Sequence, residues 1–119
     1  MNDFKIIARL LAAIKASEES PVFDVALVDE KVIKATAKQR DNLAIKLQKA
    51  GYIEGLTVID DIDNQTVPYI AWNQSKPAIT LSGLEWMDNN DSLKKAVKEI
   101  KEMGTSVAAK IIGNIIQGM

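Results

Sequence analysis

Carboxylates and lysines are the side chains in this sequence that could do chemistry, because its 119 residues include neither histidine nor cysteine. Without cysteine there can be no disulfide, no thiolate zinc site and no cysteine nucleophile. Without histidine, the commonest general base and the commonest metal ligand are missing. The sequence also has no nucleophile elbow, Walker loop, glycine-rich dinucleotide turn or zincin motif. We therefore predict a protein that is not an enzyme and that binds no cofactor.

Three aspartates, Asp60, Asp61 and Asp63, lie close enough in the sequence to suggest a metal site. A calcium loop of the EF-hand type requires glycine at its sixth position. Counting from Asp61, Gln65 is at the fifth position and Thr66 takes the place of this glycine, so the pattern fails. A stretch rich in aspartate and asparagine is instead typical of a solvated turn. No metal is predicted.

Lysines are concentrated between residues 31 and 50. This stretch carries six basic side chains and one acidic side chain, a local charge of +5 in a chain whose net charge is −1. Lysine neutralises phosphates, and asparagine can pair with the edge of adenine. The predicted nucleic-acid-binding residues are Lys34, Lys38, Asn42, Lys46 and Lys49.

A helix must position these residues, and the pattern predicts one from Ala37 to Ala50, with Thr36 as its N-cap. Gly51 suits the left-handed residue that commonly follows a helix. At about 100° per residue, the face predicted to pack on the core holds Thr36, Leu43, Leu47 and Ala50. The opposite face is centred on Lys38, Ile45 and Lys49, with Asp41, Asn42 and Gln48 beside them.

Ile45 is apolar but falls on the outward face of this helix. A thymine methyl group could cover it if the helix enters DNA. A contact with a partner protein explains it better, since exposed apolar residues often mark such contacts.

The first 34 residues predict helices. An apolar helix begins near Asp3 and ends before Pro21, which disfavours helical geometry in the residue before it. Its apolar arc is wide, so it is predicted to be buried on more than one side. A short extended piece and a short helix are expected within residues 22–34.

The middle of the chain predicts β-structure. Residues 52–72 are expected to form one β-hairpin, with Pro68 on an edge strand. Residues 78–80 are expected to be briefly extended. A short helix follows, with Thr80 or Ser82 as its N-cap, and a longer helix is expected from about Ser92.

The C-terminal residues form a broad apolar arc with Lys110 as their one charged side chain. This arc could pack on the first helix or form a dimer seam, and both interpretations stay open. A membrane surface is disfavoured because one lysine makes a poor basic face, and no membrane partner is predicted. The predicted protein-interface residues are Ile45, Val107, Ile111, Ile112, Ile115 and Ile116.

Three sequence stretches carry a family resemblance. LQKAGYIEGL at 47–56 is similar to the junction between a recognition helix and the first wing strand. PAITLSGLEWMDNND at 77–91 and KKAVKEIKEM at 94–103 are similar to the two helices that follow. Together they resemble the YjcQ-like family of small winged-helix proteins, found mostly in bacteria and in phage or prophage regions. The resemblance implies an α+β winged-helix domain over 1–103. Residues 104–119 are expected to be a helical extension that packs on this domain or on a partner.

A winged-helix domain uses a helix-turn-helix to place one helix in the major groove of DNA. We therefore expect a cytoplasmic, dimeric DNA-binding protein, a regulator of the phage or prophage type, with 36–50 as recognition helix. The expected wing opposes this function, because residues 54–66 include Glu54, Asp60, Asp61 and Asp63 and no basic residue. The alternative is a non-catalytic protein-interaction module that makes contact through Ile45 and the C-terminal helix.

Overall fold

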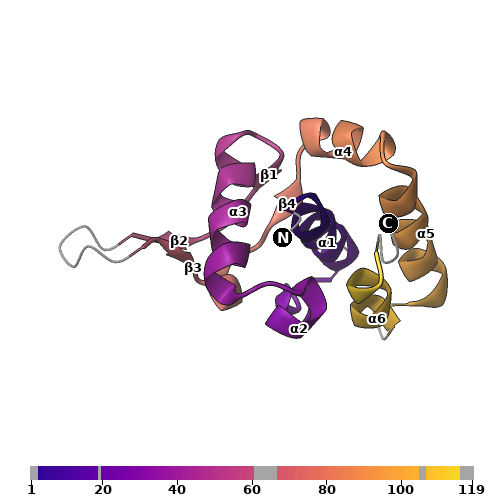
Figure 1. Ribbon diagram of the computed structural model, residues 1–119, viewed down its shortest axis with the longest axis horizontal. Helices are drawn as coiled ribbons and strands as arrows, with labels where there is room; N and C mark the ends of the chain where they lie inside the picture. The colour runs from indigo at the N-terminus through magenta and orange to yellow at the C-terminus, as the bar shows by residue number, and fades with distance from the viewer. Residues whose placement is uncertain (1–2, 19, 61–66, 105–106, 116–119) are drawn as a thin grey trace.

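The computed structural model describes residues 3–18, 20–60, 67–104 and 107–115, and within them the chain is α+β, as predicted (Figure 1). The described residues form six α-helices: α1 (Asp3–Ser17), α2 (Glu30–Ile33), α3 (Ala37–Lys49), α4 (Leu81–Asp88), α5 (Asp91–Met103) and α6 (Ala108–Gly113). The four short strands are β1 (Ile53–Glu54), β2 (Val58–Ile59), β3 (Tyr69–Ile70) and β4 (Ala78–Ile79). Short 3-10 helices lie at Val25–Val28 and Trp72–Gln74. No described helix is long and apolar enough to cross a membrane.

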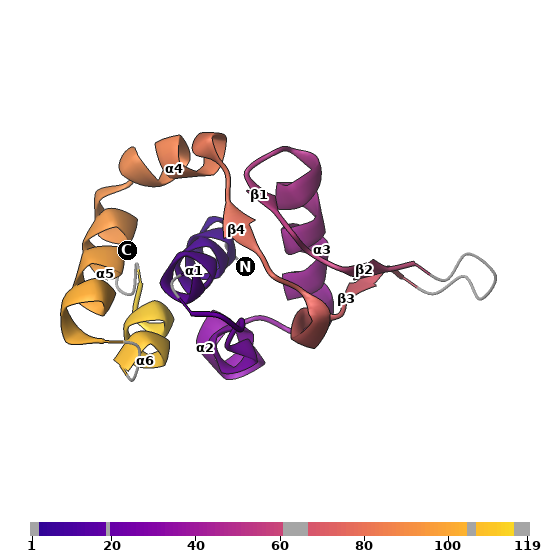
Figure 2. The same cartoon turned by 180° about the vertical axis from the view of Figure 1, so that it is seen from behind.

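Helix α1 is the centre of the core. Figures 1 and 2 show α3 on one side of it and α5 with α6 on the other. Its side chains are buried almost all round, which confirms the wide apolar arc predicted from the sequence. The buried residues of α1 are Ile6, Ala8, Arg9, Leu10, Leu11, Ala12, Ala13, Ile14 and Ser17.

Helices α2 and α3 form the predicted helix-turn-helix. Lys34 ends α2 in the left-handed conformation, with φ 61° and ψ 46°. Two residues later Thr36 caps α3 in a capping box: its hydroxyl accepts from the Gln39 N–H at 3.2 Å, and the Gln39 side chain accepts from the Thr36 N–H at 3.1 Å. Gly51 has φ +87° after the helix, as expected from its position. Local sequence signals therefore fix both ends of α3.

The hairpin predicted over 52–72 is confirmed for β2 and β3 and wrong for β1. Only β2 and β3 pair with each other, with Val58 opposite Ile70, whereas β1 pairs with β4, which comes later in the chain. Gly55 separates β1 from β2 in a left-handed conformation, with φ +88°. The Gly55 carbonyl accepts from the Lys76 N–H at 3.1 Å. This hydrogen bond holds the segment before β4 beside the end of β1. The β2–β3 hairpin therefore extends away from the body of the molecule (Figures 1 and 2).

The helices after β4 begin at side-chain caps. Thr80 caps α4 by accepting from the Gly83 N–H, so the alternative cap Ser82 lies inside the helix. Asn90 caps α5 by accepting from the Leu93 N–H at 3.0 Å, and α5 begins at Asp91, one residue before the predicted start. On its inner face α5 buries Leu93, Ala96, Val97 and Ile100.

The Arg9 side chain is buried and reaches two helix ends. It donates to the carbonyl of Ile33 at 3.3 Å and to the carbonyl of Ile115 at 3.5 Å. It forms no ion pair with a carboxylate of the described residues. Burial therefore lowers the pKa of the Arg9 guanidinium. Through this side chain α1 holds the end of α2 and the residues after α6 together.

Candidate nucleic-acid interface

The five predicted nucleic-acid-binding residues are all exposed. Lys34 lies in the turn before α3, and the other four, Lys38, Asn42, Lys46 and Lys49, lie on α3. Spacings of four, four and three residues place these four side chains along one side of the helix. The sequence analysis therefore identified one continuous exposed stripe on α3, which we call the α3 stripe.

The core-facing side of α3 differs from the predicted one. Leu43 and Leu47 are buried as expected, but Ala50 is exposed, and Asp41 and Ala44 are buried instead. The buried arc is therefore turned toward Ala44, and the centre of the exposed arc moves from Lys38 to about Asn42.

Ile45 is the residue most affected by this rotation. It is half-buried and packs against the core, so its predicted place at the centre of the outward face is wrong. Its contact with a partner protein stays a prediction.

Asp41 is the functional feature that the sequence analysis missed. Its carboxylate accepts from the Trp72 indole N–H at 2.9 Å and from the Ile70 backbone N–H at 3.1 Å. The Nε atom of Arg40 pairs with the same carboxylate at 2.8 Å. These contacts attach α3 to the end of the wing, so Asp41 positions the two elements of the winged helix relative to each other.

Arg40 is engaged within the molecule and is not part of the α3 stripe. It donates to the Val28 carbonyl at 2.8 Å and lies over the Trp72 ring, 5.6 Å from its centroid. The opposite charges of Arg40 and Asp41 cancel. The local charge of +5 therefore belongs to five exposed lysines, Lys31, Lys34, Lys38, Lys46 and Lys49.

The acidic residues of the wing are described in part. Glu54 in β1 and Asp60 after β2 are exposed, while the predicted turn with Asp61 and Asp63 lies outside the described residues. The hairpin points away from the body beside α3 in both views (Figures 1 and 2). Among the residues with described positions, no group of three acidic side chains is arranged to hold a metal ion.

A family model described as YjcQ protein matches residues 4–104. The chain belongs to the YjcQ family. No curated protein and no solved structure matches. The matched range includes every residue of the α3 stripe, both strand pairs and the whole of α5, so the helix-turn-helix and its wing are the part that this YjcQ family member shares with its family.

Helix α6 lies beyond the range that the YjcQ family model matches. It packs on α1, α2 and α5, which is the intramolecular alternative of the sequence analysis. Of the predicted interface residues, Ile112 and Ile115 are buried, Val107 and Ile111 are half-buried, and Ile116 lies outside the described residues.

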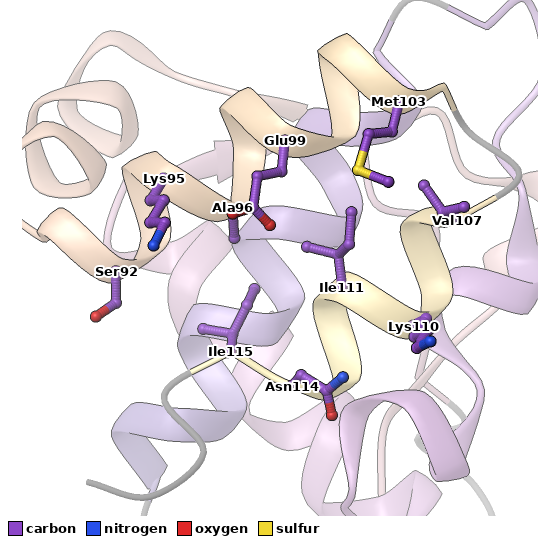
Figure 3. A pocket seen from close by; sticks show the side chains of 10 residues that line it. All are labelled: Ser92, Lys95, Ala96, Glu99, Met103, Val107, Lys110, Ile111, Asn114 and Ile115. Atoms are coloured by element: carbon purple, nitrogen blue, oxygen red, sulfur yellow. The ribbon is translucent and has the colours of Figure 1, made fainter.

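A groove of about 440 Å³ separates α5 from α6 in this YjcQ family member (Figure 3). Val107, Ile111 and Ile115 line it from the α6 side, and Ala96 and Met103 line it from α5. Met103 is 62% exposed at its rim. We call it the α5–α6 groove. Part of the predicted interface therefore remains accessible after α6 has packed on the domain.

Proposed function

We propose that this protein binds double-stranded DNA through the α3 stripe, as a regulator of the phage or prophage type, and that it acts as a dimer in the cytoplasm. The observation that carries the proposal is the α3 stripe itself. Three lysines and one asparagine stand exposed on the second helix of a helix-turn-helix, and none of the lysines forms an ion pair within the described residues. The regulatory and phage-associated role rests on the family resemblance alone.

The α3 stripe suits the major groove. The recognition helix of a helix-turn-helix contacts base edges mainly through its N-terminal half. Asn42, near the middle of the exposed arc, can accept from and donate to the edge of adenine. Lys38 and Lys49 lie near opposite ends of α3 and can each neutralise a phosphate. The exposed Glu54 and Asp60 carboxylates oppose phosphate binding, so the lysines of the α3 stripe must supply the attraction.

Removing two lysines of the α3 stripe is expected to weaken DNA binding. In Lys38→Ala/Lys49→Ala, two phosphate contacts are lost, and the slope of log affinity against log salt should fall by roughly 2. Fluorescence anisotropy with a mixed-sequence duplex at several salt concentrations measures both quantities.

The matched control is Lys98→Ala/Lys101→Ala, which removes the same charge from exposed positions of α5. It should keep the salt slope of the wild type. If the wild type binds no mixed-sequence DNA at low salt, or if both double variants lose the same affinity, the α3 stripe is not the DNA site.

The α5–α6 groove favours a second candidate function, a protein-interaction module. A contiguous apolar patch that stays exposed marks an interaction site in soluble proteins. Met103 stands exposed beside the half-buried Val107 and Ile111, whereas the half-buried Ile45 offers less surface. A second copy of the chain is the partner that this candidate requires.

Met103→Lys separates this candidate from DNA binding alone. If copies associate through the α5–α6 groove, light scattering should give the mass of a dimer for the wild type and of a monomer for the variant, because association would remove the introduced ammonium group from water. The control is Lys31→Ala, a substitution at an exposed position of α2 that does not line the α5–α6 groove. A monomeric wild type over the whole concentration range would exclude the second candidate.

A further inference from the structure

A second groove, of about 450 Å³, lies between α4 and α5 at the end of α1. Four lysines line it: Lys94, Lys98 and Lys101 from α5, and Lys15 from α1. The one carboxylate in its lining is Asp88. We call it the basic groove. It belongs to the range matched by the family model and shares no residue with the α3 stripe.

Lysines outnumber carboxylates in the lining of the basic groove. Lys94, Lys98 and Lys101 follow at spacings of four and three, so they share one side of α5, and all three are exposed. None of them forms an ion pair with a carboxylate among the described residues, while Lys15 pairs with Glu18 at 2.8 Å. The groove therefore presents a positive field to whatever enters it.

The floor of the basic groove is apolar. It consists of Leu84, Met87 and Val97, of which Leu84 is half-buried and the other two are mostly covered. A phosphate could contact the lysines but would leave the apolar side chains of the floor in contact with water. Apolar side chains that enter the groove would displace water chiefly from Leu84, since Met87 and Val97 are only 5% and 9% exposed. The combination of an apolar floor and a basic rim thus favours a ligand that has both kinds of group.

We propose that the basic groove binds an acidic, amphipathic segment of another protein. A helix that lays its apolar side chains in a groove is a common form of peptide recognition. Here the apolar side chains would lie on Leu84, Met87 and Val97. The carboxylates of the same helix, spaced by three and four residues, would face Lys94, Lys98 and Lys101.

The position of the basic groove leaves the α3 stripe free. In both views α5 lies on the opposite side of α1 from α3 and the hairpin (Figures 1 and 2). A segment bound in the basic groove would therefore not cover Lys38 or Lys49. The proposal does not depend on DNA binding, and the two sites can be tested separately.

Fluorescence anisotropy with labelled synthetic peptides of sixteen or so residues tests the proposal. The probe peptide carries glutamates on one helical face and leucines on the other. The first control peptide has the same composition in an order without separate faces, and the second has glutamate and alanine without leucine. We expect the probe to bind at least about fivefold more tightly than either control, because only the probe matches both rim and floor.

Two charge-reversal variants locate the site. Lys98→Glu should lower the affinity for the probe peptide by about tenfold, because an attraction to its glutamates becomes a repulsion. Lys31→Glu makes the same change at an exposed position of α2, which does not line the basic groove, and should change the affinity less than about twofold. Lys38→Ala/Lys49→Ala should bind the probe like the wild type even if it loses DNA.

Three results would overturn the proposal. The first is equal binding of the probe and the reordered peptide, which would show charge attraction without a fitted site. The second is displacement of the probe by a DNA duplex in Lys38→Ala/Lys49→Ala, which would make the basic groove a nucleic-acid site. The third is self-association of the wild type that Asp60→Lys and Lys98→Glu each abolish, since the wing of a second copy would then be the occupant.

Discussion

Asp41→Ala is expected to lose about 3–5 kcal/mol of the free energy of unfolding, the largest loss that we expect from one side chain. Alanine removes the acceptor of the Trp72 indole N–H and of the Ile70 backbone N–H, and it leaves Arg40 without its carboxylate. Trp72 and Ile70 are buried, so their donors cannot turn to water. A domain of this size has roughly 5–15 kcal/mol of stability in total. The loss would therefore take a large share of the total stability.

Urea unfolding followed by circular dichroism measures this loss. Asp41→Asn keeps an oxygen acceptor without the charge, so its loss should lie between those of the wild type and Asp41→Ala. Asp60→Ala, which removes an exposed aspartate from the hairpin, is the control and should change stability by less than about 0.5 kcal/mol. A loss below about 1 kcal/mol in Asp41→Ala would show that the carboxylate does not hold α3 to the wing.

Gly55→Ala is expected to have the second largest effect, about 2–5 kcal/mol. Gly55 has φ +88°, which costs an L-residue about 1–2 kcal/mol. A Cβ atom at this position would also lie 2.2 Å from the Lys76 carbonyl oxygen. Relieving such a clash requires the backbone to move, which typically costs about 1–3 kcal/mol more. The two terms add because they have different causes.

Gly51→Ala is the matched variant for Gly55→Ala. Gly51 has φ +87°, nearly the same angle, but a Cβ atom there would meet nothing within 4 Å. It should therefore lose only the conformational term of about 1–2 kcal/mol. The difference between the two midpoints of urea unfolding measures the close approach of Gly55 to Lys76. Equal midpoints would mean that β1 and the segment before β4 do not lie as close as described.

The parts of the fold that could be predicted from the sequence are those set by neighbouring residues. Thr36 and Gln39 stand three apart and cap α3 by themselves, and Gly51 ends the helix without help from the rest of the chain. The pairing of β1 with β4 could not be predicted in the same way. Each strand has two residues, too few for a pattern, and the partner of β1 is set by Gly55 meeting Lys76, 21 positions later.

In the candidate site, too, the features set by neighbouring residues could be predicted, and those set by distant residues could not. The exposure of the α3 stripe could be predicted because lysine and asparagine are rarely buried. The same rule gave the wrong place for Asp41, since a carboxylate can be buried when donors surround it. Those donors are on Ile70 and Trp72, about thirty residues away, and no sequence pattern near Asp41 predicts them. The rotation of α3 about its axis, and with it the burial of Ile45, follows from that distant partner.

Arg9 connects a segment inside the range that the family model matches to a segment outside that range. One of its hydrogen bonds reaches Ile33, inside the range that the family model matches, and the other reaches Ile115, outside it. A buried guanidinium with only the first of these acceptors would be poorly compensated. Residue 9 and the segment after residue 104 should therefore vary together among relatives: where no helix equivalent to α6 is present, an apolar side chain is the better occupant of position 9.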